Sequence, residues 1–262
     1  MKEDAIVDFC DYPKYMNLKS GDVIFINSDL RKVFCDMHVN RRKIDLNAFI
    51  DGLIDQVGPD GTIIFPTYNW DFCNGIAFDI NKTPSKTGSL GQYSLKRTDF
   101  RRTAHPIYSF SVYGRYQDLF CSMNNTESFG EDSPFAALKK LKCKNYMIDV
   151  TLKGCFTYMH YAEQASGVVH YRYHKNFTAD YTDSENHTSK RTYSMFVRDL
   201  DLDVFNTVDP IEKDFIDDGA EDIIRINSSV IRVVYLDKAL DILLNDIKNN
   251  SSKKLCRYKG QC

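Results

Sequence analysis

The chain has 262 residues, of which 43% are hydrophobic, and a formal net charge of −2 at pH 7. These values predict a single domain over residues 1–262 with enough apolar side chains for a sizeable core. They exclude the basic excess typical of nucleic-acid-binding proteins, and no apolar run approaches the roughly 20 residues of a membrane span. We therefore expect neither a nucleic-acid partner nor a membrane segment.

The N-terminal sequence and the cysteines indicate a cytoplasmic location. The first residues, MKEDAIVDFCDY, carry charges where a secretion signal needs an apolar core. Eight cysteines are scattered along the chain without a CxxC pair. This pattern favours free thiols in a reducing compartment over disulfides or a zinc site, so we expect no metal ion.

The first half of the chain predicts a strand–helix–strand unit. Residues 22–27 (DVIFIN) and 62–66 (TIIFP) are short apolar runs typical of buried strands. Between them, residues 46–57 carry apolar side chains at helical spacing, with Asp45 as the expected N-cap and Gly58 just beyond the helix. Such a unit implies that the two strands are parallel.

Two more strands and two more helices are predicted in the middle of the chain. Residues 110–113 and 146–150 are apolar runs typical of strands. Residues 134–141 predict a helix that a capping serine and a first-turn proline open. Residues 157–166 predict another helix, which Gly167 closes.

After Tyr171 the pattern changes to alternating residues and polar loops, which predicts an antiparallel excursion or a flap. Residues 223–236 predict a hairpin that turns at residues 227–229, and Asp237 is the expected N-cap of a last helix. The polar tail, residues 249–262, is predicted to be frayed. Together the elements predict an α/β fold: a central mixed, largely parallel sheet flanked by helices, with an antiparallel excursion in the C-terminal half.

The segment from Phe78 to Tyr113 is long, polar and rich in groups that bind anions. It contains a loop of hydroxyl and glycine residues, two adjacent arginines and a His-Pro step. Phosphates are bound by backbone N–H groups, hydroxyls and fixed cations, and this segment supplies all three. The structural alternative is a surface excursion rich in turn residues, and composition alone favours neither.

His160 and Glu163 are the strongest catalytic candidates, because their spacing places both on one face of the predicted helix. A carboxylate beside a histidine orients the ring and favours the imidazolium that forms when the histidine acts as a base. The same spacing also arises by chance, and the structural alternative is a helix histidine with a satisfied ring. A Cys155–His160 nucleophile pair across a predicted turn is a further hypothesis.

Six segments occur together and in order along the chain. They are GTIIFPTY (61–68), FD (78–79), TPSKTGSL (83–90), RTAHPIYSFSVYG (102–114), SFGEDSPFAAL (128–138) and TYMHYAE (157–163). Each is modest alone, but as an ordered set they are specific. The set resembles the aminoglycoside 3-N-acetyltransferase family, and the resemblance covers about residues 15–175.

The resemblance implies an acetyl-CoA-dependent N-acetyltransferase that acts on a small-molecule amine, of an aminoglycoside or another amino sugar. It implies that His160 is the general base with Glu163 near it, and that Asp79 attracts the cationic substrate. Coenzyme A is expected at two sets of residues: the loop residues Ser28, Leu30, Ser85, Thr87 and Gly88, and the groove residues His105, Pro106 and Ser109.

The chain departs from the family at three positions. Asp29 replaces a small hydroxyl residue beside the expected coenzyme A phosphates, Gln92 replaces a glutamate, and Asp149 replaces a glycine. The sequence leaves three functions open. They are acetylation of an aminoglycoside antibiotic, acetylation of a biosynthetic, nucleotide-linked amino sugar of a surface polysaccharide, and coenzyme A binding without catalysis.

Overall fold

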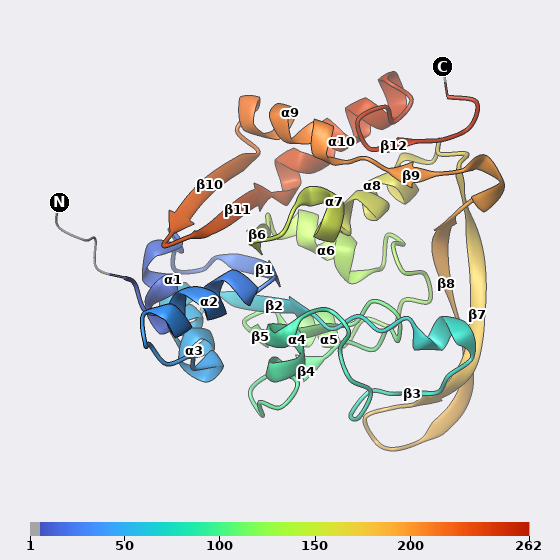
Figure 1. The fold of residues 1–262 in the computed structure, drawn as a ribbon. Coiled ribbons are helices and arrows are strands. Elements are labelled where there is room, and N and C mark those ends of the chain that lie inside the picture. The colour runs from blue at the N-terminus through green and yellow to red at the C-terminus, as the bar shows by residue number, and fades with distance from the viewer. Residues whose placement is uncertain (1–5, 262) are drawn as a thin grey trace.

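A seven-stranded sheet forms the centre of the computed structural model, which describes residues 6–261 (Figure 1). The strand order is β10 (Glu221–Ile226), β11 (Ser229–Tyr235), β6 (Lys144–Ile148), β1 (Val23–Ser28), β2 (Thr62–Pro66), β5 (Phe110–Gly114) and β4 (Arg101–Arg102). β1 is parallel to β2 and β6, whereas β5 and β11 run antiparallel to their neighbours. Five of the seven strands therefore point the same way, which confirms the predicted α/β class.

The predicted strand–helix–strand unit is confirmed. The helix, α3 (Leu46–Val57), begins after Asp45, whose carboxylate accepts a hydrogen bond from the Ala48 N–H at 3.0 Å. It ends at Gly58, which has a φ of 66° that a glycine adopts without steric cost. The hairpin expected near the C-terminus is also confirmed, since β10 and β11 pair in antiparallel register.

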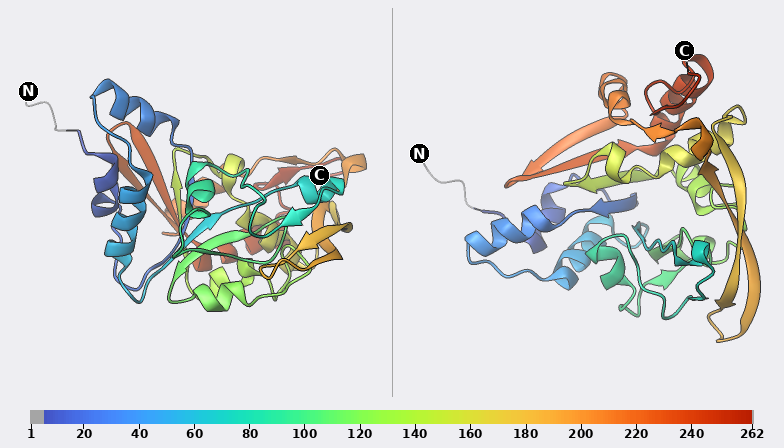
Figure 2. Two further views of the ribbon diagram at one scale, coloured as in Figure 1. Left: turned by 90° about the horizontal axis from the view of Figure 1, so that it is seen from below. Right: turned by 45° about the vertical axis from the view of Figure 1, so that its right-hand side comes forward.

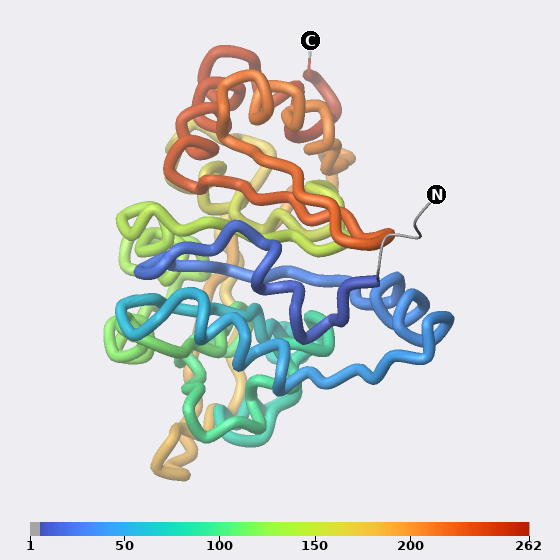
Figure 3. Tube along the Cα trace, turned by 90° about the vertical axis from the view of Figure 1, so that its left-hand side faces the viewer, coloured from blue at the N-terminus to red at the C-terminus, as the bar shows by residue number. Residues whose placement is uncertain are grey.

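Helices cover both faces of the sheet, as Figures 2 and 3 show. α1 (Tyr12–Tyr15), α2 (Arg31–Val39) and α3 pack on one face, and α6 (Pro134–Lys140), α8 (Tyr158–Ser166) and α10 (Leu236–Asn249) on the other. Successive residues of β1 alternate between the two cores: Ile24 and Ile26 face α3, whereas Phe25 faces α6. A strand buried on both faces reads as a continuous apolar run, which is why β1 was visible in the sequence.

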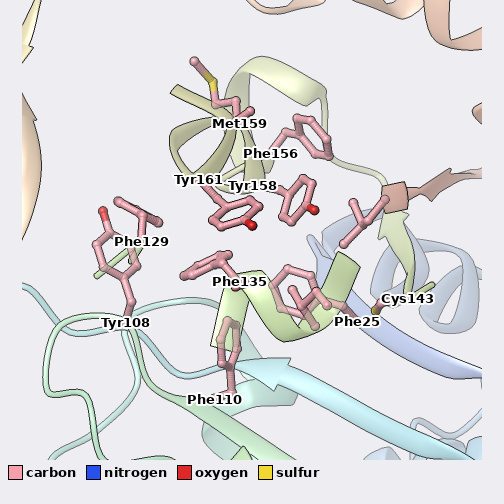
Figure 4. Packing of buried hydrophobic residues seen from close by; sticks show 14 of the residues in the cluster. Phe25, Tyr108, Phe110, Phe129, Phe135, Cys143, Phe156, Tyr158, Met159 and Tyr161 are labelled. Atoms are coloured by element: carbon pink, nitrogen blue, oxygen red, sulfur yellow. The ribbon is translucent and has the colours of Figure 1, made fainter. Parts of the chain in front are cut away.

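An aromatic cluster fills the space between the sheet and α6 and α8. Phe110 of β5 lies 5.3 Å from Phe25 and 5.2 Å from Phe135 of α6, measured between ring centroids. Figure 4 shows these rings together with Tyr158 of α8. The edge-to-face contacts hold α6 against the sheet, and Tyr158 joins α8 to the same cluster.

The antiparallel excursion is a long hairpin that stands along one side of the molecule (Figure 2, right). It consists of β7 (Arg172–Thr182) and β8 (Thr188–Arg198), which pair along their full lengths. β3 (Phe78–Asp79) adds to the far end of β7 and completes a three-stranded sheet. The hairpin thus connects the polar segment after β2 with the C-terminal end of α8.

Short elements complete the chain. They are the helices α4 (Ser89–Ser94), α5 (Gln117–Cys121), α7 (Leu152–Cys155) and α9 (Glu212–Asp217), the 3₁₀ helices Phe9–Asp11, Asp71–Asn74, Leu200–Leu202 and Asp209–Ile211, and the strands β9 (Phe205–Asn206) and β12 (Cys256–Arg257). No helix within residues 6–261 is long and apolar enough to cross a membrane.

Two expectations for the C-terminus are wrong. α10 begins at Leu236, so Asp237 lies in its first turn and is not the N-cap. Residues 249–261 of the tail are not frayed in the structure: β12 pairs with β9, and Leu255 is fully buried. Its polar residues suggested fraying, but they are used locally, because Asn250 and the Lys254 N–H donate to the buried carboxylate of Asp246.

Replacing Leu255 by alanine tests whether the tail is part of the core. We expect the free energy of unfolding to fall by about 2–5 kcal/mol, because a fully buried leucine leaves a cavity. Urea unfolding followed by circular dichroism measures this change. Lys253→Ala, at an exposed position two residues away, is the matched control and should change little. Equal stability of the two variants would show that the tail does not pack.

Candidate active site

The predicted pair on α8 is present. The Nδ1 of His160 lies 2.7 Å from Oε2 of Glu163, one helical turn apart. α8 ends at Gly167, whose φ of 68° turns the chain toward β7. The chain then returns to Glu163 through Tyr171, just before β7, and Arg172, the first residue of β7.

Glu163 is a fully buried carboxylate with three partners. Besides His160, the guanidinium Nε of Arg172 lies 2.7 Å from Oε2, and the Tyr171 hydroxyl lies 3.0 Å from Oε1. Burial raises the pKa of Glu163, but the charge of Arg172 and the hydrogen bond from His160 outweigh it, so that the pKa lies below its ordinary value. The carboxylate is therefore ionised at neutral pH and only accepts hydrogen bonds.

His160 is a neutral imidazole with a defined tautomer. Burial lowers its pKa, the positive charge of Arg172 lowers it further, and Glu163 opposes both effects without cancelling them. Because Glu163 only accepts, Nδ1 carries the proton, and Nε2 keeps its lone pair on the side of the ring away from Glu163. The ring also packs edge-to-face on Phe129, at 5.7 Å between centroids. Such a histidine is poised to accept a proton.

His160 opens into a pocket of about 410 Å³ between α8, the hairpin and the loops after β2 and β4. The side chain of His160 is 18% exposed. Aromatic and cationic residues dominate the lining, which comprises Trp70, Tyr108, His160, Arg172, Tyr173, Lys175, Phe177, Met195, Phe196, Val197, Arg198, Leu200 and Asn206.

Sequence reasoning missed Arg172 and Tyr171 as parts of this site. One signal pointed to them: Glu163 lies on the buried face of α8 with Met159 and Ala162, and a buried carboxylate requires a cation or several donors. The spacing of residues did not identify which cation that is. Tyr171 also reaches the C-terminal tail, since its hydroxyl lies 2.9 Å from Oγ of Ser252.

The two predicted cofactor loops lie side by side near the carboxyl ends of β1 and β2. Gly88 has a φ of 85°, and a Cβ at this position would come within 3.3 Å of the Ser28 carbonyl oxygen. The Thr87 hydroxyl donates to the Pro66 carbonyl at 2.9 Å and accepts from the Tyr68 N–H at 3.1 Å. Ser28 and Gly88 therefore lie close together, and the hydrogen bonds of Thr87 attach the loop to the end of β2.

Gln92 fastens the other side of this loop. Its side-chain carbonyl accepts the Ser85 N–H at 2.7 Å, and the Ser85 hydroxyl accepts the Thr87 N–H at 3.1 Å. A glutamate would accept the same N–H, so the departure from the family keeps this contact. Leu30, the remaining loop residue, is buried against the core under α2, so its side chain is not open to a ligand.

His105, Pro106 and Ser109 lie in the interior and do not line a groove with their side chains. His105 is 1% exposed, and its Nδ1 accepts hydrogen bonds from the N–H groups of Ile107 and Tyr108 at 3.3 and 3.2 Å. Burial lowers its pKa to about 3. The Ser109 hydroxyl donates to the Thr67 carbonyl at 2.8 Å. These groups therefore shape the loop that presents Tyr108 to the pocket.

Asp79 lies far from His160. It pairs with Thr182, ten residues beyond Arg172 along β7, which corresponds to about 33 Å of strand. Its carboxylate accepts the Asn81 N–H at 2.8 Å and lies 3.2 Å from Nζ of Lys82. The residue stabilises its own loop at the far end of the hairpin.

The remaining departures from the family have local explanations. The Asp29 carboxylate accepts hydrogen bonds from the backbone N–H and Nε of Arg31 at 3.0 and 2.9 Å, so its charge is neutralised beside the cofactor loops. Asp149 has a φ of 52°, the left-handed region that favours glycine and that aspartate tolerates. Within residues 6–261 no cluster of His, Cys, Asp and Glu side chains is arranged to hold a metal ion.

Comparison with known proteins adds a family to this geometry. Solved structures with the same fold include the aminoglycoside acetyltransferase AAC(3)-Xa (18% identity, covering 92% of this chain and 91% of that one, TM-score 0.75) and YokD from Bacillus subtilis (18%, 95% and 96%, 0.77). A third is AAC-IIIb in a binary complex with CoASH (17%, 94% and 98%, 0.77). No curated protein matches the sequence.

Identities this low show a shared fold alone. The family is shown by a match to a family model. The model described as aminoglycoside 3-N-acetyltransferase matches residues 28–246, from the end of β1 into α10. This range includes the cofactor loops, α8 and the whole hairpin. The chain therefore belongs to the aminoglycoside 3-N-acetyltransferase family, whose members are acetyl-CoA-dependent N-acetyltransferases.

Proposed function

We propose that this protein transfers an acetyl group from acetyl-CoA to a primary amine of an aminoglycoside or another amino sugar, with His160 as the general base. The observation that carries the proposal is the neutral His160 ring, oriented by an ionised, fully buried Glu163 and open to a pocket. A histidine that only stabilised the fold would not need a buried charge to fix its tautomer.

The chemistry follows from the protonation states. Acetyl-CoA supplies the acetyl group in an activated form, as a thioester. His160 Nε2 accepts a proton from the attacking amine while the new C–N bond forms, and the imidazolium is stabilised by the Glu163 carboxylate. His160 then returns that proton to the sulfur that leaves as the C–S bond breaks, so the base is regenerated. Arg172 keeps Glu163 ionised throughout.

The cofactor loops suit a phosphorylated ligand. Gly88 leaves room beside the Ser28 carbonyl, and α2 starts with the exposed side chain of Arg31, which is paired with Asp29. Arg31 and Lys32 help to line a second hollow of about 380 Å³, together with the carboxylates of Asp29, Asp36 and Asp149. We assign coenzyme A to this side of the sheet, near the carboxyl ends of β1 and β2. One structural neighbour was solved with CoASH and another with sisomicin, which supports a donor and an amino-sugar acceptor in this fold.

The competing hypotheses have less support. Burial raises the pKa of the Cys155 thiol, so this residue is not a thiolate at neutral pH, as a nucleophile needs to be. A purely binding role gives no reason for the Glu163–His160 pair. The cytoplasmic location and the single-domain organisation stay predictions.

Replacing His160 by alanine tests the base. We expect thiol release from acetyl-CoA to fall by roughly 10²–10⁴-fold with any amine that the wild type acetylates, because a positioned base contributes about that much. A thiol-reactive dye measures the release across aminoglycosides and amino sugars. His187→Ala, at an exposed position on the far tip of the hairpin, is the control. Undiminished turnover in the His160 variant would remove His160 from the mechanism.

The pH dependence of kcat tests the state of His160. Its pKa lies below the ordinary value of about 6.5, so the neutral, active form predominates above that pH. We expect kcat to be lost on acidification, with a midpoint below about pH 6.5. The residual rate of His160→Gln should lack this limb. A midpoint above pH 6.5 would mean that Glu163 raises the pKa of His160 by more than burial and Arg172 lower it.

A further inference from the structure

We infer that the pocket at His160 takes an amino sugar that carries a phosphate or diphosphate group, and not a polycationic aminoglycoside. This inference rests on the proposed acetyl transfer at the same pocket and names its acceptor. The observation behind it is the charge of the pocket wall, which three cations and no carboxylate line within the described chain.

Three cations line the pocket, and no carboxylate does so within the described chain. Arg172, Lys175 and Arg198 contribute their side chains to the wall. Glu163 lies behind His160, but it is fully buried and already contacts His160, Arg172 and Tyr171. It neutralises about one of the three positive charges. A net positive wall remains beside the nitrogen that has to receive the proton.

The three cations differ in what they are free to do. Arg172 is buried and bonded, since its terminal nitrogens donate to the Phe196 carbonyl at 3.2 Å and to the Asn206 side chain at 3.4 Å. Lys175 is exposed and lies 5.6 Å above the ring of Phe177. Arg198 is exposed and uses one nitrogen for the Val204 carbonyl at 3.1 Å. Lys175 and Arg198 therefore remain available to a ligand.

A pocket wall with a net positive charge favours a negatively charged ligand over a positively charged one. A polyamine with several ammonium groups is repelled by like charges at short range, and this pocket offers no carboxylate to offset the repulsion. Phosphate oxygens instead gain charge-assisted hydrogen bonds from guanidinium and ammonium groups. The positive charge of Arg198 also acts on the reacting ring, because it is among the groups that lower the pKa of His160.

The aromatic part of the wall suits a sugar or a nucleobase. Trp70 is 39% exposed and Tyr173 is 49% exposed, so both present ring surface to the pocket. Aromatic faces stack on the apolar faces of sugars and on bases. The volume of about 410 Å³ falls within the roughly 300–1,000 Å³ typical of small-ligand sites.

The cations are separate from the groups assigned to the donor. None of the cofactor-loop residues Ser28, Ser85, Thr87 and Gly88 lines this pocket. Arg31 and Lys32, near the loop of Ser28, are each paired with a carboxylate, Asp29 and Asp149. Because the cofactor loops lie outside the pocket at His160, we assign its positive charge to the acceptor.

Binding measured by calorimetry at low salt tests the inference without relying on catalysis. The probes are UDP-glucosamine, glucosamine 1-phosphate, glucosamine and kanamycin. We expect both phosphorylated sugars to bind more tightly than glucosamine and kanamycin, and the comparison of the two shows whether the nucleotide contributes. Lys175→Glu and Arg198→Glu should each weaken their binding by roughly tenfold or more.

Lys190→Glu is the matched control. It makes the same charge change on β8, at an exposed position paired with Asp180 and about 26 Å of strand away from Arg198. Its binding should match the wild type. Lys175→Gln is made alongside, so that a folding defect in a glutamate variant, detected by thermal unfolding, does not leave the question open.

Three results would overturn the inference: tighter binding of kanamycin than of the phosphorylated sugars, no measurable binding of either phosphorylated sugar, or binding that is indifferent to Lys175 and Arg198. A steady-state check adds a fourth. Lys175→Glu should raise the KM of the phosphorylated acceptor and leave that of acetyl-CoA unchanged, and the reverse would assign the cations to the donor.

Thiol release separates this inference from the proposed function. A phosphorylated sugar that binds through Lys175 and Arg198 but is never acetylated would contradict acetyl transfer and leave the ligand class standing. Preferential acetylation of kanamycin, lost in His160→Ala, would confirm acetyl transfer and contradict the ligand class.

Discussion

The ion pair between Glu163 and Arg172 is the contact on which the site depends. A carboxylate with no exposed surface is stable in its charged form only if a cation and several donors surround it. The cation comes from the first residue of β7, so the hairpin has to dock against α8 at its base. That docking sets one wall of the pocket, the orientation of His160 and the direction in which β7 leaves the domain core.

The same pair sets a compromise in the reactivity of His160. Glu163 makes the imidazolium more stable and fixes the tautomer, whereas Arg172 and burial make the imidazolium less stable. The result is a base that is free at neutral pH and still has a counter-charge when it takes a proton. Arg198 combines both effects, because it lowers the pKa of His160 and, with Lys175, lines the pocket with positive charge that attracts an anion.

Sequence reasoning succeeded where the signals were local. α3 was defined by its own cap, its own apolar spacing and its own terminal glycine, and the His160–Glu163 contact by one helical turn. It failed where a residue's role depends on a distant partner. Arg172 was missed, and the surroundings of Asp79 and His105 were not foreseen, because only the fold decides which polar residue is buried, which is exposed and which lies at the far end of a strand. The polar tail misled for the same reason, since its partners lie on α10 and β9.

The hydroxyl contacts behind Glu163 extend the site to the end of the chain. The Tyr171 hydroxyl lies between Glu163 and Ser252. Because the carboxylate only accepts, the tyrosine donates its proton to Glu163, and the Ser252 hydroxyl donates to the tyrosine oxygen. Ser252 itself is held by α10, through its N–H to the Asp246 carbonyl at 3.0 Å. A fragment that ended with α10 would keep every residue that lines the pocket, but it would lack Ser252 and so remove one hydrogen-bond partner of Tyr171 behind Glu163. The smallest unit that preserves the site extends past α10 to include the turn at Ser252.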